Sequence, residues 1–112
     1  MLINKVNELN IQLVRGDTLS FVFEIEGLDV DLTTAYFTVK EQPDDDSPVF
    51  EKSLTNGISK VTTGKYLVKV APTDTKYLDI NNYSYDLEIS VGNDVYTVMK
   101  GTLKLVQDIT VK

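Results

Sequence analysis

Alternation of apolar and polar residues with a period of two recurs along this chain, and it constrains the fold more than any other feature. Leu19, Phe21, Phe23 and Ile25 alternate with mostly polar neighbours, as in a strand that buries one face. A helix would instead place apolar residues three or four positions apart. The other segments that share the alternation are 9–13, 35–39, 66–70, 85–91, 95–106 and, more weakly, 49–54. The chain is therefore expected to consist of strands, with 49–54 at a sheet edge.

Turn signals separate these segments. Gly92-Asn93-Asp94 stands between two β-rich runs and predicts a tight hairpin between antiparallel neighbours. Residues 72–78 are the only helical stretch, a single turn in which Tyr77 and Leu78 are expected to cover the core.

The last β-rich run changes phase. Tyr96 and Val98 have one parity, whereas Leu103 and Leu105 have the other. One extra residue in a strand reverses which side chains point inward. We therefore expect a β-bulge at Lys100-Gly101.

These segments predict one domain over residues 1–112: an all-β, antiparallel sandwich of about seven strands with one short helical turn. A tyrosine after a corner, at the start of the penultimate strand, is typical of immunoglobulin-like sandwiches, where its hydroxyl bonds back to the corner backbone. Tyr83 and Tyr85 stand at such a place. We expect Tyr85 to be buried and Tyr83 to be partly exposed.

Composition narrows the functional classes. The 112 residues include no cysteine and no histidine, which removes thiolate chemistry, disulfides, the commonest general base and the commonest transition-metal ligand. Seventeen acidic against eleven basic side chains give a net charge of −6, which disfavours binding to phosphate backbones. The sequence contains no glycine-rich phosphate loop and no apolar run of membrane-spanning length, and its opening residues lead us to expect no export signal. We expect no enzymatic activity, no cofactor, and neither nucleic acid nor membrane as a partner.

Two groups of residues are candidate contacts for a protein partner. Asp44, Asp45 and Asp46 form the most polar stretch, which is expected to be a solvated loop rather than a Ca²⁺ site, because the spacing and glycine of a calcium loop are missing. Tyr36 and Tyr83 are candidate aromatic anchors on an outer face. Arg15-Gly16-Asp17 matches a cell-adhesion tripeptide, but a tight turn between two strands explains it more simply.

The order of short segments from residue 11 to about 110 resembles a family of phage and prophage proteins with an immunoglobulin-like fold, including the amino-terminal domains of baseplate upper proteins of phages of Gram-positive bacteria. The segments that carry this resemblance are 15–21 (RGDTLSF), 30–35 (VDLTTA), 37–40 (FTVK), 64–66 (GKY), 72–75 (PTDT), 83–88 (YSYDLE), 95–97 (VYT), 100–103 (KGTL) and 108–110 (DIT).

The resemblance implies a structural or assembly protein of a phage particle, in the tail, baseplate or head surface. It would be made in the host cytoplasm and would contact other virion proteins, with self-association an open option. The family has no catalytic residues to transfer. Two other hypotheses stay open at this point: a phage-encoded inhibitor of a host protein, suggested by small size and acidity, and a carbohydrate-binding module that uses exposed tyrosines.

Overall fold

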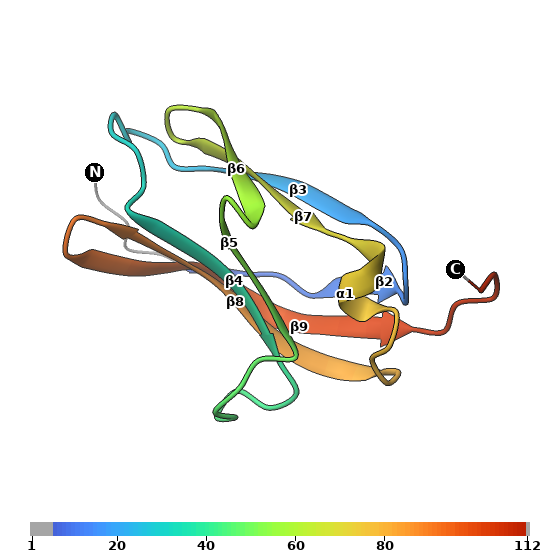
Figure 1. Cartoon of the computed structure of the whole chain (residues 1–112). Coiled ribbons are helices and arrows are strands. Elements are labelled where there is room, and N and C mark those ends of the chain that lie inside the picture. Colours follow the sequence, from blue (N-terminus) through green and yellow to red (C-terminus); the bar gives the residue numbers. More distant parts are fainter. Residues whose placement is uncertain (1–5, 112) are drawn as a thin grey trace.

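The computed structural model describes residues 6–111, and in this part of the chain nearly all regular structure is strand (Figure 1). A single helix, α1 (Pro72–Thr75), interrupts the strands. The strands in chain order are β1 (Asn7–Glu8), β2 (Ile11–Val14), β3 (Leu19–Glu24), β4 (Thr34–Lys40), β5 (Phe50–Leu54), β6 (Gly57–Thr62), β7 (Lys65–Val70), β8 (Asn81–Val91) and β9 (Asp94–Val106). The prediction of an all-β chain with one short helical turn is confirmed.

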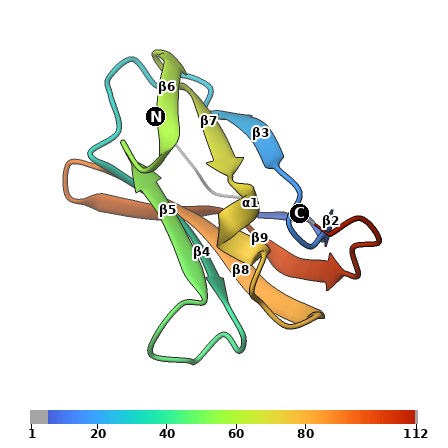
Figure 2. The same cartoon turned by 45° about the vertical axis from the view of Figure 1, so that its right-hand side comes forward.

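The strands form one sheet that curls over to enclose a core (Figure 2). Its order is β1-β9-β8-β4-β5-β6-β7-β3, and β2 also pairs with β9. Most neighbours are antiparallel, including the predicted β8–β9 hairpin around Gly92. The exceptions are β1 and β2, which lie parallel to β9, and a two-residue parallel contact between β5 and β6. That contact joins the two halves of the sandwich.

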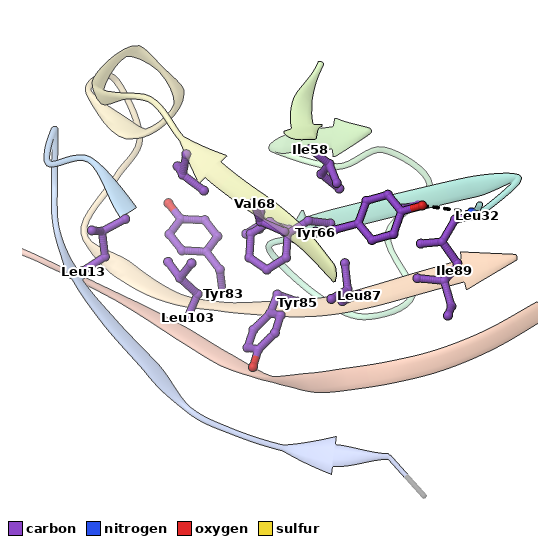
Figure 3. Close-up of a cluster of buried hydrophobic side chains, with 14 of the residues drawn as sticks. Leu13, Leu32, Ile58, Tyr66, Val68, Tyr83, Tyr85, Leu87, Ile89 and Leu103 are labelled. Atoms are coloured by element: carbon purple, nitrogen blue, oxygen red, sulfur yellow. Dashed lines mark hydrogen bonds between the residues drawn. The ribbon is translucent and has the colours of Figure 1, made fainter. Parts of the chain in front are cut away.

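The core lies between the half made of β9, β8 and β4 and the half made of β6, β7 and β3 (Figure 3). Phe37 on β4 is fully buried and its ring lies 5.5 Å from that of Phe21 on β3, edge to face. The same ring lies 5.4 Å from that of Tyr85 on β8. Such aromatic pairs add to the free energy gained by burying apolar area. Phe37 therefore connects both halves.

The predicted exposure of Tyr83 is wrong. Tyr83 and Tyr85 are two residues apart on one strand, so they face the same side, and each is only 4% exposed. The Tyr83 hydroxyl donates a 2.6 Å hydrogen bond to the carbonyl of Asp79, four residues upstream. Tyr83, not Tyr85, thus makes the corner bond of an immunoglobulin-like sandwich. The two hydroxyls point in different directions (Figure 3).

The predicted change of phase in β9 is confirmed, but its position is wrong. Leu87 pairs with Met99 and Glu88 with Thr97, so the extra residue is Val98 rather than one at Lys100-Gly101. Gly101 itself pairs regularly with Tyr85.

Gly101 is needed for a different reason, the close approach of another strand. A Cβ atom at residue 101 would lie 2.1 Å from the carbonyl oxygen of Leu9. That carbonyl accepts a hydrogen bond from the Tyr85 hydroxyl instead of one from β9, and the amide N–H of Thr102 bonds to the side chain of Asn10. The Leu9 amide still donates to the carbonyl of Lys100. The N-terminal strand is therefore kinked between β1 and β2 and held against β9.

One strand is not predicted by the sequence, and two further expectations need correction. β6 was not predicted, because Ile58 is its only buried residue and no alternation marks it. β5 is an interior strand rather than an edge, since it pairs with β4 and β6. Tyr77 is 83% exposed and does not cover the core, whereas Leu78 packs against it as predicted. The side chain of Thr75 is buried there instead, and its hydroxyl accepts a hydrogen bond from the amide of Gly16.

We expect Gly101→Ala to destabilise the fold by about 1–3 kcal/mol, because the new methyl group would overlap backbone that cannot move without breaking hydrogen bonds. Denaturant unfolding measures the loss. Amide hydrogen exchange adds a local readout: the Leu9 amide, which bonds to Lys100, should exchange faster. An unchanged unfolding midpoint with unchanged Leu9 protection would contradict the packing described above.

Candidate functional site

A hollow of about 920 Å³ lies over the outer face of β9, β8, β4 and β5. Its floor is formed by residues that alternate with the core side chains, among them Thr38, Ser84 and Asp86. Pro43, Asp46 and Pro48, in the loop between β4 and β5, form one side, and this loop projects past the strand ends (Figure 2). Glu8 and Asn10, from the kinked N-terminal strand, form the opposite side. We refer to this feature as the outer-face hollow.

One cross-strand row of polar side chains crosses the floor of the outer-face hollow. Thr38 on β4 pairs with Asp86 on β8, which pairs with Lys100 on β9. At one end of the row the Thr38 hydroxyl donates a 2.6 Å hydrogen bond to the Glu51 carboxylate of β5. At the other end the Lys100 ammonium lies 4.0 Å from the Glu8 carboxylate. Residues opposite each other on neighbouring strands share a face, so strand pairing alone assembles this row.

Negative charge dominates the outer-face hollow. Its charged lining comprises five carboxylates and two ammonium groups: Glu8, Asp46, Glu51, Asp86, Glu88, Lys40 and Lys100. A concave surface with excess charge of one sign concentrates its field and favours a partner of the opposite sign. The arrangement therefore favours cationic or hydrogen-bond-donating groups.

Asp86 is the residue of this row whose ionised form is disfavoured by burial. Partial burial raises the pKa of its carboxyl group, the neighbouring Lys40 ammonium lowers it, and the Glu51 carboxylate raises it again. The ionised form is thus less stable here than in water. A cationic group entering the hollow would relieve that cost.

The predicted contact residues divide into three groups. Tyr36, 36% exposed, and Asp46 both line the outer-face hollow. Asp44 is exposed outside the lining, and Asp45 closes its own loop, since its carboxylate accepts a 3.0 Å hydrogen bond from the amide of Gln42. Tyr83 is buried and bonded to Asp79, so the prediction that it is a surface anchor is wrong.

Several lining residues were not singled out from the sequence, notably Asp86, Lys100 and Glu8. The signal was present as parity, because Asp86 and Glu88 alternate with buried residues of β8. Parity assigns a side chain to the outer face but does not say which strands are neighbours. The pairing of β8 with β4 and β9 supplies that information.

The other motifs have structural explanations. Gly16, with a φ of 83°, turns the chain between β2 and β3, as predicted for Arg15-Gly16-Asp17. The Arg15 guanidinium pairs with the Asp108 carboxylate at 3.1 Å and also donates to the carbonyl of Leu78.

Across residues 6–111 no three His, Cys, Asp or Glu side chains group as a metal site. In the same range no helix is long and apolar enough to cross a membrane.

Comparison with known proteins shows the fold. No protein-family model matches the sequence, and no curated protein sequence is significantly similar to it. Among solved structures, the immunoglobulin-like domain of mouse leukocyte-associated immunoglobulin-like receptor 1, a strand-swapped dimer, is similar with a TM-score of 0.52 and 15% identity over 95% of both chains. The extracellular domain of the voltage-gated sodium channel β4 subunit, a parallel homodimer, has a TM-score of 0.50 and 10% identity over 97% of this chain and 99% of its own. The chain has an immunoglobulin-like fold, as the sequence predicts.

We expect Asp86→Asn to stabilise the protein at neutral pH. A carboxyl group whose pKa is raised on folding makes its ionised form unfavourable in the folded state, and that cost vanishes as the pH falls through the folded pKa. The gain in thermal midpoint over wild type should therefore shrink on acidification toward the ordinary pKa of 3.8. Thermal unfolding of both proteins between pH 3 and 8 measures it.

Lys40→Met provides the matched second variant. Removing the ammonium group that lowers the pKa of Asp86 should extend to higher pH the interval over which stability falls, and should therefore lower the midpoint at neutral pH. A difference between Asp86→Asn and wild type that is the same at every pH would contradict the role assigned to burial.

Proposed function

We propose that this chain is a non-enzymatic assembly module of a phage particle that holds a protein partner through the outer-face hollow. The observation that carries the proposal is the hollow itself, a concave, acidic surface built on regular strands of an immunoglobulin-like sheet. The place in a virion rests on the sequence resemblance given above. Because the hollow is acidic, the expected partners are other virion proteins that present a segment bearing lysine or arginine.

The composition of the hollow supports binding of a protein rather than catalysis. Its carboxylates are spread over three strands and a loop, and none is paired with a histidine or cysteine, because the chain has neither. Rigid strands hold the side chains in place, which lowers the entropic cost of binding. Tyr36 on the floor offers an aromatic anchor of the kind enriched in interfaces. Charge complementarity would supply orientation and association rate.

Purified particles test the proposal directly. Antibodies raised against the chain should label particles by immunogold microscopy, and the chain should copurify with them in constant proportion to the capsid protein. Labelling of infected cells without labelling of particles would contradict the virion role.

Variants locate the contact. Asp86→Lys together with Glu88→Lys reverses charge in the outer-face hollow and should reduce incorporation into particles by tenfold or more, on the order of the effect of like charges at an interface. Asp29→Lys together with Asp79→Lys is the matched control, since both residues are exposed and outside the lining. Equal loss in both pairs would assign the effect to net charge rather than to the hollow.

A second candidate function is glycan binding, favoured by one observation. Tyr36 lies beside carboxylates and hydroxyl groups on a concave face, a combination that can stack on a sugar ring and accept its hydroxyl hydrogen bonds. A glycan array probed with wild type and Tyr36→Ala separates the candidates. Binding that is lost in Tyr36→Ala would support the glycan role, whereas silence of the wild type would remove it.

A further inference from the structure

One border of the curled sheet is formed by β3, an uninterrupted strand whose outer side has no neighbouring strand within residues 6–111. Among the described residues β3 pairs only with β7, and it stands at the end of the strand order. Figures 1 and 2 show β3 with β7 along one side only. Its six residues, LSFVFE, include no proline, no lysine and no bulge, which are the features that commonly protect an edge from pairing with another strand.

The register shows which backbone groups face outward. The amide of Ile25 donates to the carbonyl of Gly64 at 2.8 Å. In an antiparallel ladder, residues alternate between bonding to one side and to the other. Leu19, Phe21 and Phe23 therefore bond to β7, whereas Ser20, Val22 and Glu24 direct their N–H and C=O groups away from β7.

The opposite border of the sheet has a different character. There the N-terminal strand is broken between β1 and β2 at Leu9-Asn10. The Leu9 carbonyl is taken by the Tyr85 hydroxyl, and the Asn10 side chain bonds to β9. A kinked edge of this kind is a poor template for a further strand. Of these two borders, within residues 6–111, β3 is the one with an uninterrupted ladder.

We propose that two copies of this chain associate through their β3 strands, antiparallel about a twofold axis at Val22. This axis places Val22 opposite Val22 of the second copy, and Ser20 opposite Glu24 of the second copy. All three outward-facing residues then meet as hydrogen-bonded pairs, with about six backbone hydrogen bonds across the axis. The outer-face side chains of β3 in one copy also meet the outer-face side chains of β3 in the other, because residues opposite each other on neighbouring strands share a face. The result is a continuous sheet through β6, β7 and β3 of both copies.

The side chains on the outer face fit this pairing. Val22 is 48% exposed and lies next to Leu67 of β7, so two copies would join these into one covered apolar stripe. Ser20 lies next to Lys69 of β7. Glu24 of one copy would thus stand two strands, about 9.6 Å, from Lys69 of the other, with only a serine between them. Glutamate and lysine side chains span that separation, so the charges are complementary in this register.

The association goes beyond the proposed function and is independent of it. No residue of β3 lines the outer-face hollow, so both hollows of the dimer stay open. A dimer that presents two binding surfaces gains avidity for a partner that repeats.

Sedimentation equilibrium of the full chain tests the proposal. A small edge interface should give a reversible dimer with a Kd on the order of 10–100 µM. Val22→Lys places two ammonium groups side by side at the axis and should raise the Kd at least tenfold. Val61→Lys is the matched control, because Val61 is 49% exposed on β6, away from the β3 edge, and it should leave the Kd unchanged.

A charge exchange tests the register. Glu24→Lys and Lys69→Glu should each weaken the dimer about three- to tenfold, since each substitution acts twice across the axis, and the double variant should return the Kd to within about twofold of wild type. Thermal midpoints of all variants at a concentration where each is monomeric confirm folding.

Three outcomes would overturn the proposal. The first is a wild-type chain that stays monomeric up to about 1 mM, which would leave the β3 edge to a strand of another protein. The second is a dimer that Val22→Lys and Val61→Lys weaken equally. The third is a dimer that the double charge variant does not restore, which would exclude this register.

Discussion

The contact of the Leu9 carbonyl with Tyr85 and Gly101 decides the arrangement of both borders of the sheet. The missing side chain at residue 101 lets the N-terminal strand approach β9, and the Tyr85 hydroxyl holds it there. Because β1 and β2 pair with β9, they do not cover β3. The same placement brings Glu8 and Asn10 to one side of the outer-face hollow. One close backbone contact thus shapes the candidate site and leaves an opposite edge unpaired.

The two proposed surfaces belong to different halves of the sandwich and depend on different interactions. The outer-face hollow depends on side-chain charge, with carboxylates that strand pairing gathers on one face. The β3 edge depends on backbone hydrogen bonds, with Val22 and the Glu24–Lys69 relation adding selectivity of register. Charge favours a class of partner, whereas a ladder favours a strand of matching length and alternation. A module with both could self-associate and still hold a partner.

The errors of sequence interpretation have definite causes. Residues two apart in a strand share a face, so Tyr83 is buried with Tyr85, and only the position of the corner decides which hydroxyl bonds to it. A change of parity reveals that a bulge exists but not where, because Val98 and Lys100-Gly101 satisfy the pattern equally. β6 was missed since one buried residue, Ile58, gives no periodicity. Of the candidate contact residues, Tyr36 and Asp46 reached the hollow and Asp44, Asp45 and Tyr83 did not.

By itself the sequence determined the fold class, the tight β8–β9 hairpin, the helical turn and the faces of most strands, because periodicity and turn chemistry are local properties. It also determined the chemistry that a chain without histidine and cysteine lacks. Only the tertiary structure decided which strands are neighbours, which polar side chains share the outer-face hollow, why residue 101 is glycine and which edge is left unpaired. Those features join residues far apart in the chain, and no local pattern specifies such pairings.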